Sequence, residues 1–199
     1  MSGKDTLSKS DKVFLRISIV QTVLAVIAFL TGLIALSATV TESSAIRKQT
    51  SASVWPYVQF GVENFDPETQ TMLVRVSLKN SGVGPAKLKG MRIALGDRVM
   101  KNWEQLLKTA VPDEKPLFVY GFTNNRVMAA NDQIDILLIK DPEYAQKVLG
   151  NLQTSNLNFE YCYCSIFEEC WLVNFSGPAK QDIKKVKNCP KWGEDTFQN

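Results

Sequence analysis

The sequence contains no histidine among its 199 residues. Histidine is the side chain whose unperturbed pKa lies nearest to neutral pH, and it supplies the base of Ser-His-Asp and Cys-His sites and many metal ligands. Its absence argues against these classes, and we expect the protein not to be an enzyme. The formal net charge of +3 is too small to indicate a nucleic-acid partner. No cofactor and no small-molecule substrate are evident.

Charged residues are also missing from one long stretch, residues 17–40 (ISIVQTVLAVIAFLTGLIALSATV). About 20 apolar helical residues cross a hydrocarbon core of about 30 Å. The stretch therefore predicts one transmembrane helix over 17–40, after a cytoplasmic tail (1–16) and before a juxtamembrane stalk (41–53). Signal-peptide apolar regions are shorter, about 7–15 residues, which favours an uncleaved anchor over a cleaved signal sequence. Ala28 and Gly32 form a small-xxx-small pair that could support a helix–helix contact.

Cysteine is scarce, and its four positions all lie late in the chain, at Cys162, Cys164, Cys170 and Cys189. An even number in a compact cluster, on a chain with one membrane crossing, predicts disulfides in an oxidising compartment. If residues 166–168 form a tight hairpin loop, Cys164 lies opposite Cys170, and Cys162 then pairs with Cys189. The rival pairing joins Cys162 to Cys170 and Cys164 to Cys189.

The same sulfurs support a hypothesis from another class. A C-x-C pair with two further thiols could hold Cu(I) or Zn²⁺, or act as redox-active thiols. Zinc ribbons prefer paired C-x₂₋₄-C knuckles, which Cys189 does not complete, so structural disulfides are favoured. Four basic residues precede the apolar run and two follow it, which is a weak positive-inside signal. The cysteines therefore decide the expected topology, with the N-terminus inside and residues 54–199 outside the cytoplasm.

From residue 54 onward the pattern changes to short strands and turns. Residues 71–80 (TMLVRVSLKN) alternate as a half-buried strand does. Residues 80–86 (NSGVGPA) predict a turn in which Gly82 and Gly84 take positive φ. The pattern predicts an antiparallel β-sandwich domain over 54–179 and a basic tail over 180–199 tied back by Cys189. The other expected elements are strands at 54–62, 86–95, 117–120, 132–140, 157–165 and 169–176, a turn at Gly177-Pro178, and helices at 101–109 and from Asp141-Pro142-Glu143 to Gly150.

Two further patterns invite a functional interpretation. Glu168 and Glu169 are a carboxylate pair, but glycosidase carboxylates face each other across a cleft, whereas neighbours on a strand point to opposite faces, so a solvated hairpin end is favoured. Aromatic residues at strand spacing could line a ligand groove, although packing within the sheets is the commoner use. They are Trp55, Tyr57, Phe60, Tyr161, Tyr163 and Trp171.

Four short motifs lie C-terminal to the apolar run: WPYV (55–58), NSGVGPA (80–86), CYCS (162–165) and CW (170–171). Together they resemble a group of uncharacterised bacterial single-pass membrane proteins, and the strand–turn–strand is similar to immunoglobulin-like domains of bacterial envelope proteins. The resemblance implies an immunoglobulin-like domain outside the bacterial cytoplasmic (inner) membrane, and it brings no catalytic residues.

We therefore expect a membrane-tethered, non-enzymatic interaction module, plausibly an accessory subunit of an envelope complex. Its expected partner is a protein or a second copy of itself, in addition to the membrane. Trp55 and Tyr57 form the expected interaction surface. The alternative is a thiol-based copper-binding or redox protein that uses Cys162 and Cys164.

Overall fold

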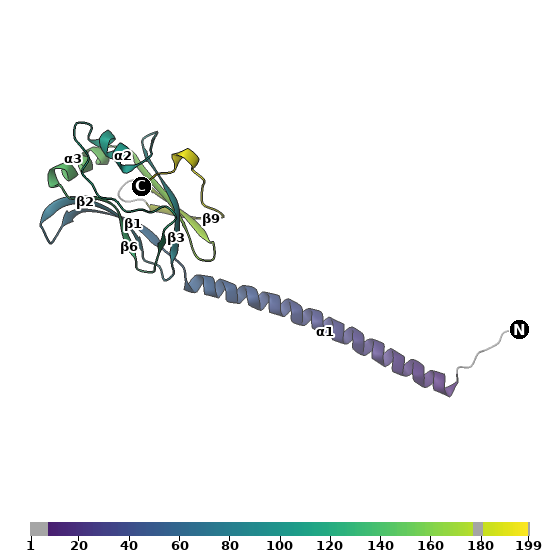
Figure 1. Ribbon diagram of the computed structural model, residues 1–199. Coiled ribbons are helices and arrows are strands. Elements are labelled where there is room, and N and C mark those ends of the chain that lie inside the picture. The colour runs from purple at the N-terminus through teal and green to yellow at the C-terminus, as the bar shows by residue number, and fades with distance from the viewer. Residues whose placement is uncertain (1–7, 177–180, 199) are drawn as a thin grey trace. The chain divides into compact units, whose positions relative to one another are not determined.

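The structure is a computed structural model that describes residues 8–176 and 181–198 (Figure 1). The chain divides into two compact units, residues 1–50 and 51–199. The first unit carries one long helix. The second is built from antiparallel β-sheets and two short α-helices. Residues 1–7, residue 199 and the predicted turn at Gly177-Pro178 lie outside the described residues.

Helix α1 (Lys9–Ser53) contains the apolar run and is longer than the predicted span of 17–40. It begins inside the expected tail, and it continues through the expected stalk without a break. None of its residues is buried, so it is not the core helix of a soluble fold, and by length and composition it can cross a membrane. Several hydroxyl groups of the apolar run donate to carbonyls of the preceding turn: the Thr31 hydroxyl donates to the Ile27 carbonyl at 3.0 Å.

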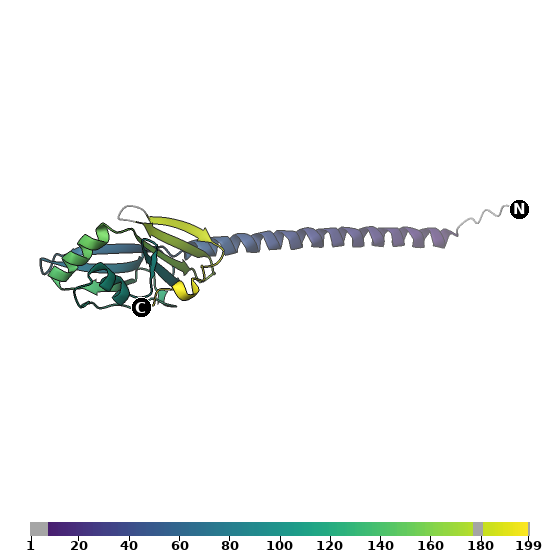
Figure 2. The same cartoon turned by 90° about the horizontal axis from the view of Figure 1, so that it is seen from above.

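Two antiparallel sheets form the framework of the second unit (Figure 2). The first sheet has the strand order β1-β2-β6, with β1 (Val58–Asp66), β2 (Thr71–Asn80) and β6 (Gln133–Ile139). The second has the order β4-β3-β7-β8-β9, and β5 also pairs with β3. Its strands are β3 (Ala86–Leu95), β4 (Arg98–Met100), β5 (Val127–Met128), β7 (Leu157–Cys164), β8 (Cys170–Ser176) and β9 (Gln181–Val186).

Both short helices begin at side-chain caps. The Asn102 side chain caps α2 (Trp103–Ala110), and the Asp141 carboxylate caps α3 (Pro142–Gln153) by accepting from the Tyr144 N–H at 2.7 Å. The start of α3 is the one predicted from Asp-Pro-Glu. Its predicted end at Gly150 is wrong, because the helix runs on to Gln153 and packs Leu152 against the core.

Apolar side chains from both sheets and both short helices share one core. Phe197 is an unexpected member: it is fully buried, its N–H donates to the Met91 carbonyl at 2.8 Å, and its ring meets Trp103 edge-on at 4.8 Å. Strand β9 pairs with β8 along its length. The basic tail predicted over 180–199 is tied back by Cys189 as expected, and the part that the structure describes also forms a strand of the second sheet.

The glycines of the turn after β2 are needed for close backbone approach. A Cβ at Gly82 would lie 2.4 Å from the Tyr57 nitrogen, and one at Gly84 would lie 1.8 Å from the Val54 carbonyl oxygen. Neither glycine is among the described residues with positive φ, so the predicted reason for these glycines is wrong. They make room for the backbone of residues 54–57, which docks onto the turn.

Asn80 holds this docking in place from a fully buried position. Its side-chain oxygen accepts from the Tyr57 N–H at 3.2 Å and the Gly82 N–H at 3.1 Å. Its amide nitrogen donates to the carbonyls of Gly84 at 2.8 Å and Ala129 at 2.9 Å. One amide side chain thereby satisfies four backbone groups and joins three separate segments, which we call the Asn80 clamp.

Candidate functional site

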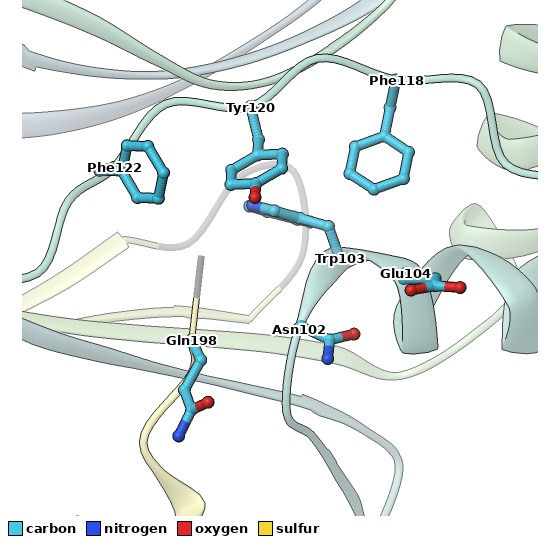
Figure 3. A pocket seen from close by; sticks show the side chains of 7 residues that line it. All are labelled: Asn102, Trp103, Glu104, Phe118, Tyr120, Phe122 and Gln198. Atoms are coloured by element: carbon cyan, nitrogen blue, oxygen red, sulfur yellow. The ribbon is translucent and has the colours of Figure 1, made fainter.

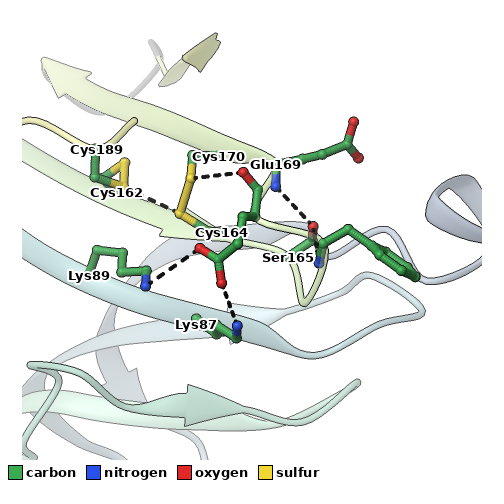
Figure 4. Close-up of polar contacts among 10 residues, drawn as sticks. Lys87, Lys89, Cys162, Cys164, Ser165, Glu169, Cys170 and Cys189 are labelled. Atoms are coloured by element: carbon green, nitrogen blue, oxygen red, sulfur yellow. Dashed lines mark hydrogen bonds and ion pairs between the residues drawn. A yellow bond between two sulfur atoms is a disulfide. The ribbon is translucent and has the colours of Figure 1, made fainter. Parts of the chain in front are cut away.

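The four cysteines form two disulfides beside the β7–β8 hairpin (Figure 4). Cys164 and Cys170 face each other in the strand register and are bonded, with their Cα atoms 4.0 Å apart. Cys162 is bonded to Cys189, with 5.7 Å between the Cα atoms. This is the arrangement expected from the hairpin. It ties the segment after β9 to the middle of the second sheet.

The two bridges lie side by side. The sulfurs of Cys164 and Cys189 are 3.6 Å apart, and the sulfurs of Cys164, Cys170 and Cys189 all lie within 4.8 Å of one another. Disulfide sulfurs are not thiolates, and thiolates are what Cu(I) or Zn²⁺ would require. The thiol-based alternative therefore needs these bonds to be reduced first.

The carboxylates of Glu168 and Glu169 diverge. Glu168 has a positive φ of 59° and its carboxylate lies 2.6 Å from the Lys87 ammonium and 3.8 Å from that of Lys89. Glu169 pairs with Lys185 at 2.7 Å. Hydrogen bonds from Lys87 to Glu168 and from Lys185 to Glu169 lower the pKa of each carboxyl group. Both groups are therefore held as carboxylates, and neither is a protonated general acid near neutral pH.

The aromatic residues predicted from strand spacing are mostly core. Tyr161, Tyr163 and Trp171 are buried, and Trp171 stacks on Tyr163 at 5.5 Å. Trp55 is 43% exposed and lies 5.4 Å from Tyr57 between ring centroids. The expected interaction surface of Trp55 and Tyr57 therefore adjoins the buried aromatic residues, and Trp55 meets the Trp171 ring edge-on. Ala28 and Gly32 lie on the exposed surface of α1, and the helix–helix contact there stays a prediction.

A second apolar surface follows residues 117–122 (LFVYGF), which we call the edge segment. No charged residue occurs from 116 to 125. Four of its six residues expose large apolar side chains to solvent: Leu117, Val119, Tyr120 and Phe122. Isolated apolar side chains on a surface are ordinary, but a contiguous uncharged run of this kind marks an interaction site or an aggregation hazard.

The backbone of the edge segment is only half paired. Val119 exchanges two hydrogen bonds with Leu138 of β6, at 2.9 and 2.8 Å, and forms a single isolated bridge. The predicted strand over 117–120 is therefore wrong, because no ladder extends from this bridge. Consecutive residues of an extended chain direct their backbone groups to opposite edges, so Phe118 and Tyr120 direct theirs away from β6. Within residues 8–176 and 181–198 these groups have no backbone partner.

An aromatic pocket of about 340 Å³ lies beside this edge (Figure 3). Phe118, Tyr120 and Phe122 form one wall, and Asn102, Glu104 and Gln198 form the other. Trp103 lies between the walls, is only 4% exposed, and has an indole N–H without a hydrogen-bond partner among the described residues. An apolar pocket with few polar groups is the usual form of a ligand site, and a buried unpaired donor favours a ligand that supplies an acceptor.

The other sheet edges are protected against pairing. Strand β9 carries Lys184 and Lys185, strand β1 carries Glu63 and Asp66, and β4 is three residues long. Charges and shortness are the usual means by which proteins keep a sheet edge from pairing with another chain. The edge segment has no charge, and this contrast makes it the candidate functional site.

Sequence reasoning missed this site. The local patterns predict only a strand at 117–120 and a helix at 101–109. The available signal was the aromatic residue at every second position from Phe118 to Phe122, in a stretch without charge.

Comparison with protein-family models, curated protein sequences and solved structures found no match to this chain. Fold and site alone therefore define its class. It is a chain with one N-terminal helix long and apolar enough to span a membrane, followed by a β-rich domain with two disulfides. Within the described residues, this domain carries an uncharged edge segment whose Phe118 and Tyr120 have no backbone hydrogen-bond partner. The resemblance to bacterial single-pass membrane proteins stays a prediction.

Proposed function

We propose that the protein is a non-enzymatic, membrane-tethered interaction module that binds a protein strand along the edge segment. The domain is an immunoglobulin-like β-sandwich on the outer side of a bacterial cytoplasmic membrane, with the N-terminus inside, and it serves as an accessory subunit of an envelope complex. One observation carries the interaction function: the unpaired backbone of Phe118 and Tyr120 in an exposed, uncharged run.

The chemistry of strand addition supports this function. An extended peptide that joins a sheet edge gains main-chain hydrogen bonds, and pockets that receive alternate side chains add specificity. Here the edge and the aromatic pocket are built from the same residues, Phe118, Tyr120 and Phe122. The unpaired indole N–H of Trp103 is a donor for which a bound chain would supply an acceptor.

Photocrosslinking in intact membranes tests the interaction function. A photoreactive amino acid is placed at Phe122 of the full chain, and in a control at Val62 on the charged β1 edge, where the exposed fraction is 49%. We expect a discrete protein adduct from position 122 that disappears when Tyr120→Lys is added. No adduct at 122, equal adducts at both positions, or an adduct that survives Tyr120→Lys would overturn the proposal.

Thiol counting tests the proposed location. Membranes carrying the full chain are alkylated before and after reduction, and the alkylated cysteines are counted by mass spectrometry. We expect no alkylation before reduction and alkylation of Cys162, Cys164, Cys170 and Cys189 after it, since disulfides persist in oxidising compartments. Alkylation of all four without reduction would place the domain in a reducing compartment.

The adjacent sulfurs of Cys164, Cys170 and Cys189 favour one second candidate, a thiol-based copper protein. Reduction by a dithiol would release soft thiolate ligands that suit Cu(I). An anaerobic Cu(I) titration of the reduced full chain tests it. This function predicts one bound ion per chain and loss of binding in Cys170→Ser, and it fails if no stoichiometric ion is bound.

A further inference from the structure

We infer that the partner at the edge segment is a second copy of this chain, paired antiparallel through residues 117–121. The inference rests on the proposed interaction function and names its partner. It draws on three properties of the edge segment: the direction of its unpaired backbone groups, its lack of charge, and the apolar area that it exposes.

The unpaired groups are self-complementary. Phe118 and Tyr120 each offer one N–H and one C=O on the outer edge. A two-fold axis at Val119 places Phe118 opposite Tyr120 of the second copy, and Tyr120 opposite its Phe118. Opposed residues in antiparallel strands alternate between hydrogen-bonded and non-hydrogen-bonded pairs. Both Phe118–Tyr120 pairs fall at hydrogen-bonded positions, which gives four new backbone hydrogen bonds, and the two Val119 residues face each other between them.

The charge distribution favours a second copy over a different protein. Strand β1 carries only carboxylates, Glu63 and Asp66, so pairing of this edge with its own copy would bring like charges together. The edge segment has no charge that would repel its own copy. A surface selected for a different partner usually carries charges complementary to that partner, and residues 116–125 carry none.

The side chains at this edge also match their own copy. Self-pairing sets Phe118 beside Tyr120 of the second copy on the pocket face, so the aromatic wall of one copy continues into the other. Within one copy these two rings already lie 5.9 Å apart between centroids. Aromatic pairs across strands are among the favourable cross-strand neighbours.

The exposed area indicates where the pairing occurs. Leu117, Val119, Tyr120 and Phe122 together offer about 400 Å² of apolar surface per copy, given about 150–250 Å² for a whole aromatic residue. Two copies then bury about 800 Å², which is below the roughly 1,200–2,000 Å² of stable interfaces. Pairing is therefore weak between freely diffusing chains, and anchoring in one membrane raises the effective concentration of one copy around the other.

Disulfide trapping in membranes tests this inference. In the full chain, Val119→Cys would set two new thiols opposite each other at a non-hydrogen-bonded pair, where Cα atoms lie about 4.5 Å apart, within disulfide range. The matched control is Val62→Cys on the β1 edge, with 49% exposure against 61% for Val119. We expect at least ten times more disulfide-linked dimer from Val119→Cys under mild oxidation.

A second variant tests the register. Tyr120→Pro removes one outward N–H and leaves the bonds between Val119 and Leu138 in place. Added to Val119→Cys, it should reduce dimer trapping at least tenfold. Equal trapping from Val119→Cys and Val62→Cys, or trapping unaffected by Tyr120→Pro, would overturn self-pairing.

The photocrosslinked adduct from position 122 gives an independent measurement that needs no new cysteine. Self-pairing requires an adduct with the mass of two chains. An adduct with a different protein that is lost in Tyr120→Lys would overturn self-pairing and leave the proposed interaction function standing. Absence of any adduct would overturn both.

Discussion

Gly84→Ala is the substitution for which the structure gives the sharpest expectation. The added Cβ would meet three backbone atoms of Val54, with the carbonyl oxygen at 1.8 Å. An ordinary contact needs about 3.4 Å, and backbone atoms cannot rotate away as a flexible side chain does. The segment that contains Val54 must therefore separate from the turn, and the Asn80 clamp must open with it.

The cost follows from the bonds at this contact. Separation stretches the Val83 N–H to Trp55 carbonyl bond, now 3.0 Å, and the Asn80 to Gly84 bond, now 2.8 Å. Each such hydrogen bond contributes about 1 kcal/mol. Overpacking adds about 1–3 kcal/mol, and the lower chain entropy of unfolded Ala returns about 0.4–1 kcal/mol. We expect Gly84→Ala to lower the free energy of unfolding by about 3 kcal/mol.

Gly150→Ala is the matched control, for which we expect the opposite change in the free energy of unfolding. Gly150 is exposed inside α3, and a Cβ there meets nothing within 4 Å. Replacing a helical glycine by alanine should raise the free energy of unfolding by about 0.8–1 kcal/mol.

Urea unfolding of the full chain in detergent measures both changes by tryptophan fluorescence, because all four tryptophans lie within residues 51–199. Gly84→Ala should move the midpoint down and Gly150→Ala should move it up. If Gly84→Ala left the midpoint unchanged or raised it, the close-approach argument would be refuted.

Two further predictions concern the core tyrosine and the disulfides. Burial raises the pKa of Tyr163 to about 12, whereas an unfolded tyrosine ionises near about 10. Stability should therefore fall as the pH rises from about 10 to about 12, and Tyr163→Phe should lessen this fall when urea midpoints at about pH 7 and about pH 11 are compared. A fall in stability that Tyr163→Phe leaves unchanged would contradict this account. The Cys162–Cys189 bridge spans 27 residues and the Cys164–Cys170 bridge spans 6. Loop entropy predicts that the double variant Cys162→Ser/Cys189→Ser loses about 3.5 kcal/mol of folding free energy, and Cys164→Ser/Cys170→Ser about 2.2 kcal/mol. The first variant should therefore melt at the lower temperature, and the reverse order would count against this account.

Local patterns were enough to predict several elements. Alternation over residues 71–80 matches β2, and the Asp141-Pro142 start matches α3. The cysteine spacing and a tight hairpin led to the cross-strand bridge between Cys164 and Cys170. In each case the determining contacts lie within a few residues along the chain, or across one hairpin, so periodicity and capping rules apply directly.

The missed features depend on contacts between distant segments. Phe197 is one aromatic residue in a lysine-rich stretch, and its burial depends on Met91 and Trp103. The alternation of the edge segment is that of a strand, but whether a neighbour pairs with its second side depends on the sheet around it. The glycines of the turn were recognised, yet their reason is the approach of Val54, which no local pattern reports.

The burial of Phe197 has a consequence for the order of events during synthesis. The apolar helix leaves the ribosome first, whereas the core can close only after Phe197 has emerged and reached Trp103. At about 5–20 residues per second, the stretch from Val54 to Phe197 takes about 7–30 s to be made. The edge segment is made about 75 residues before Phe197, and Cys162 about 35 residues before it, so they are open to other chains for about 4–15 s and about 2–7 s before the core can close. The chain after α1 therefore stays incompletely folded until Phe197 has been made, and during that interval it depends on whatever shields unfolded chains.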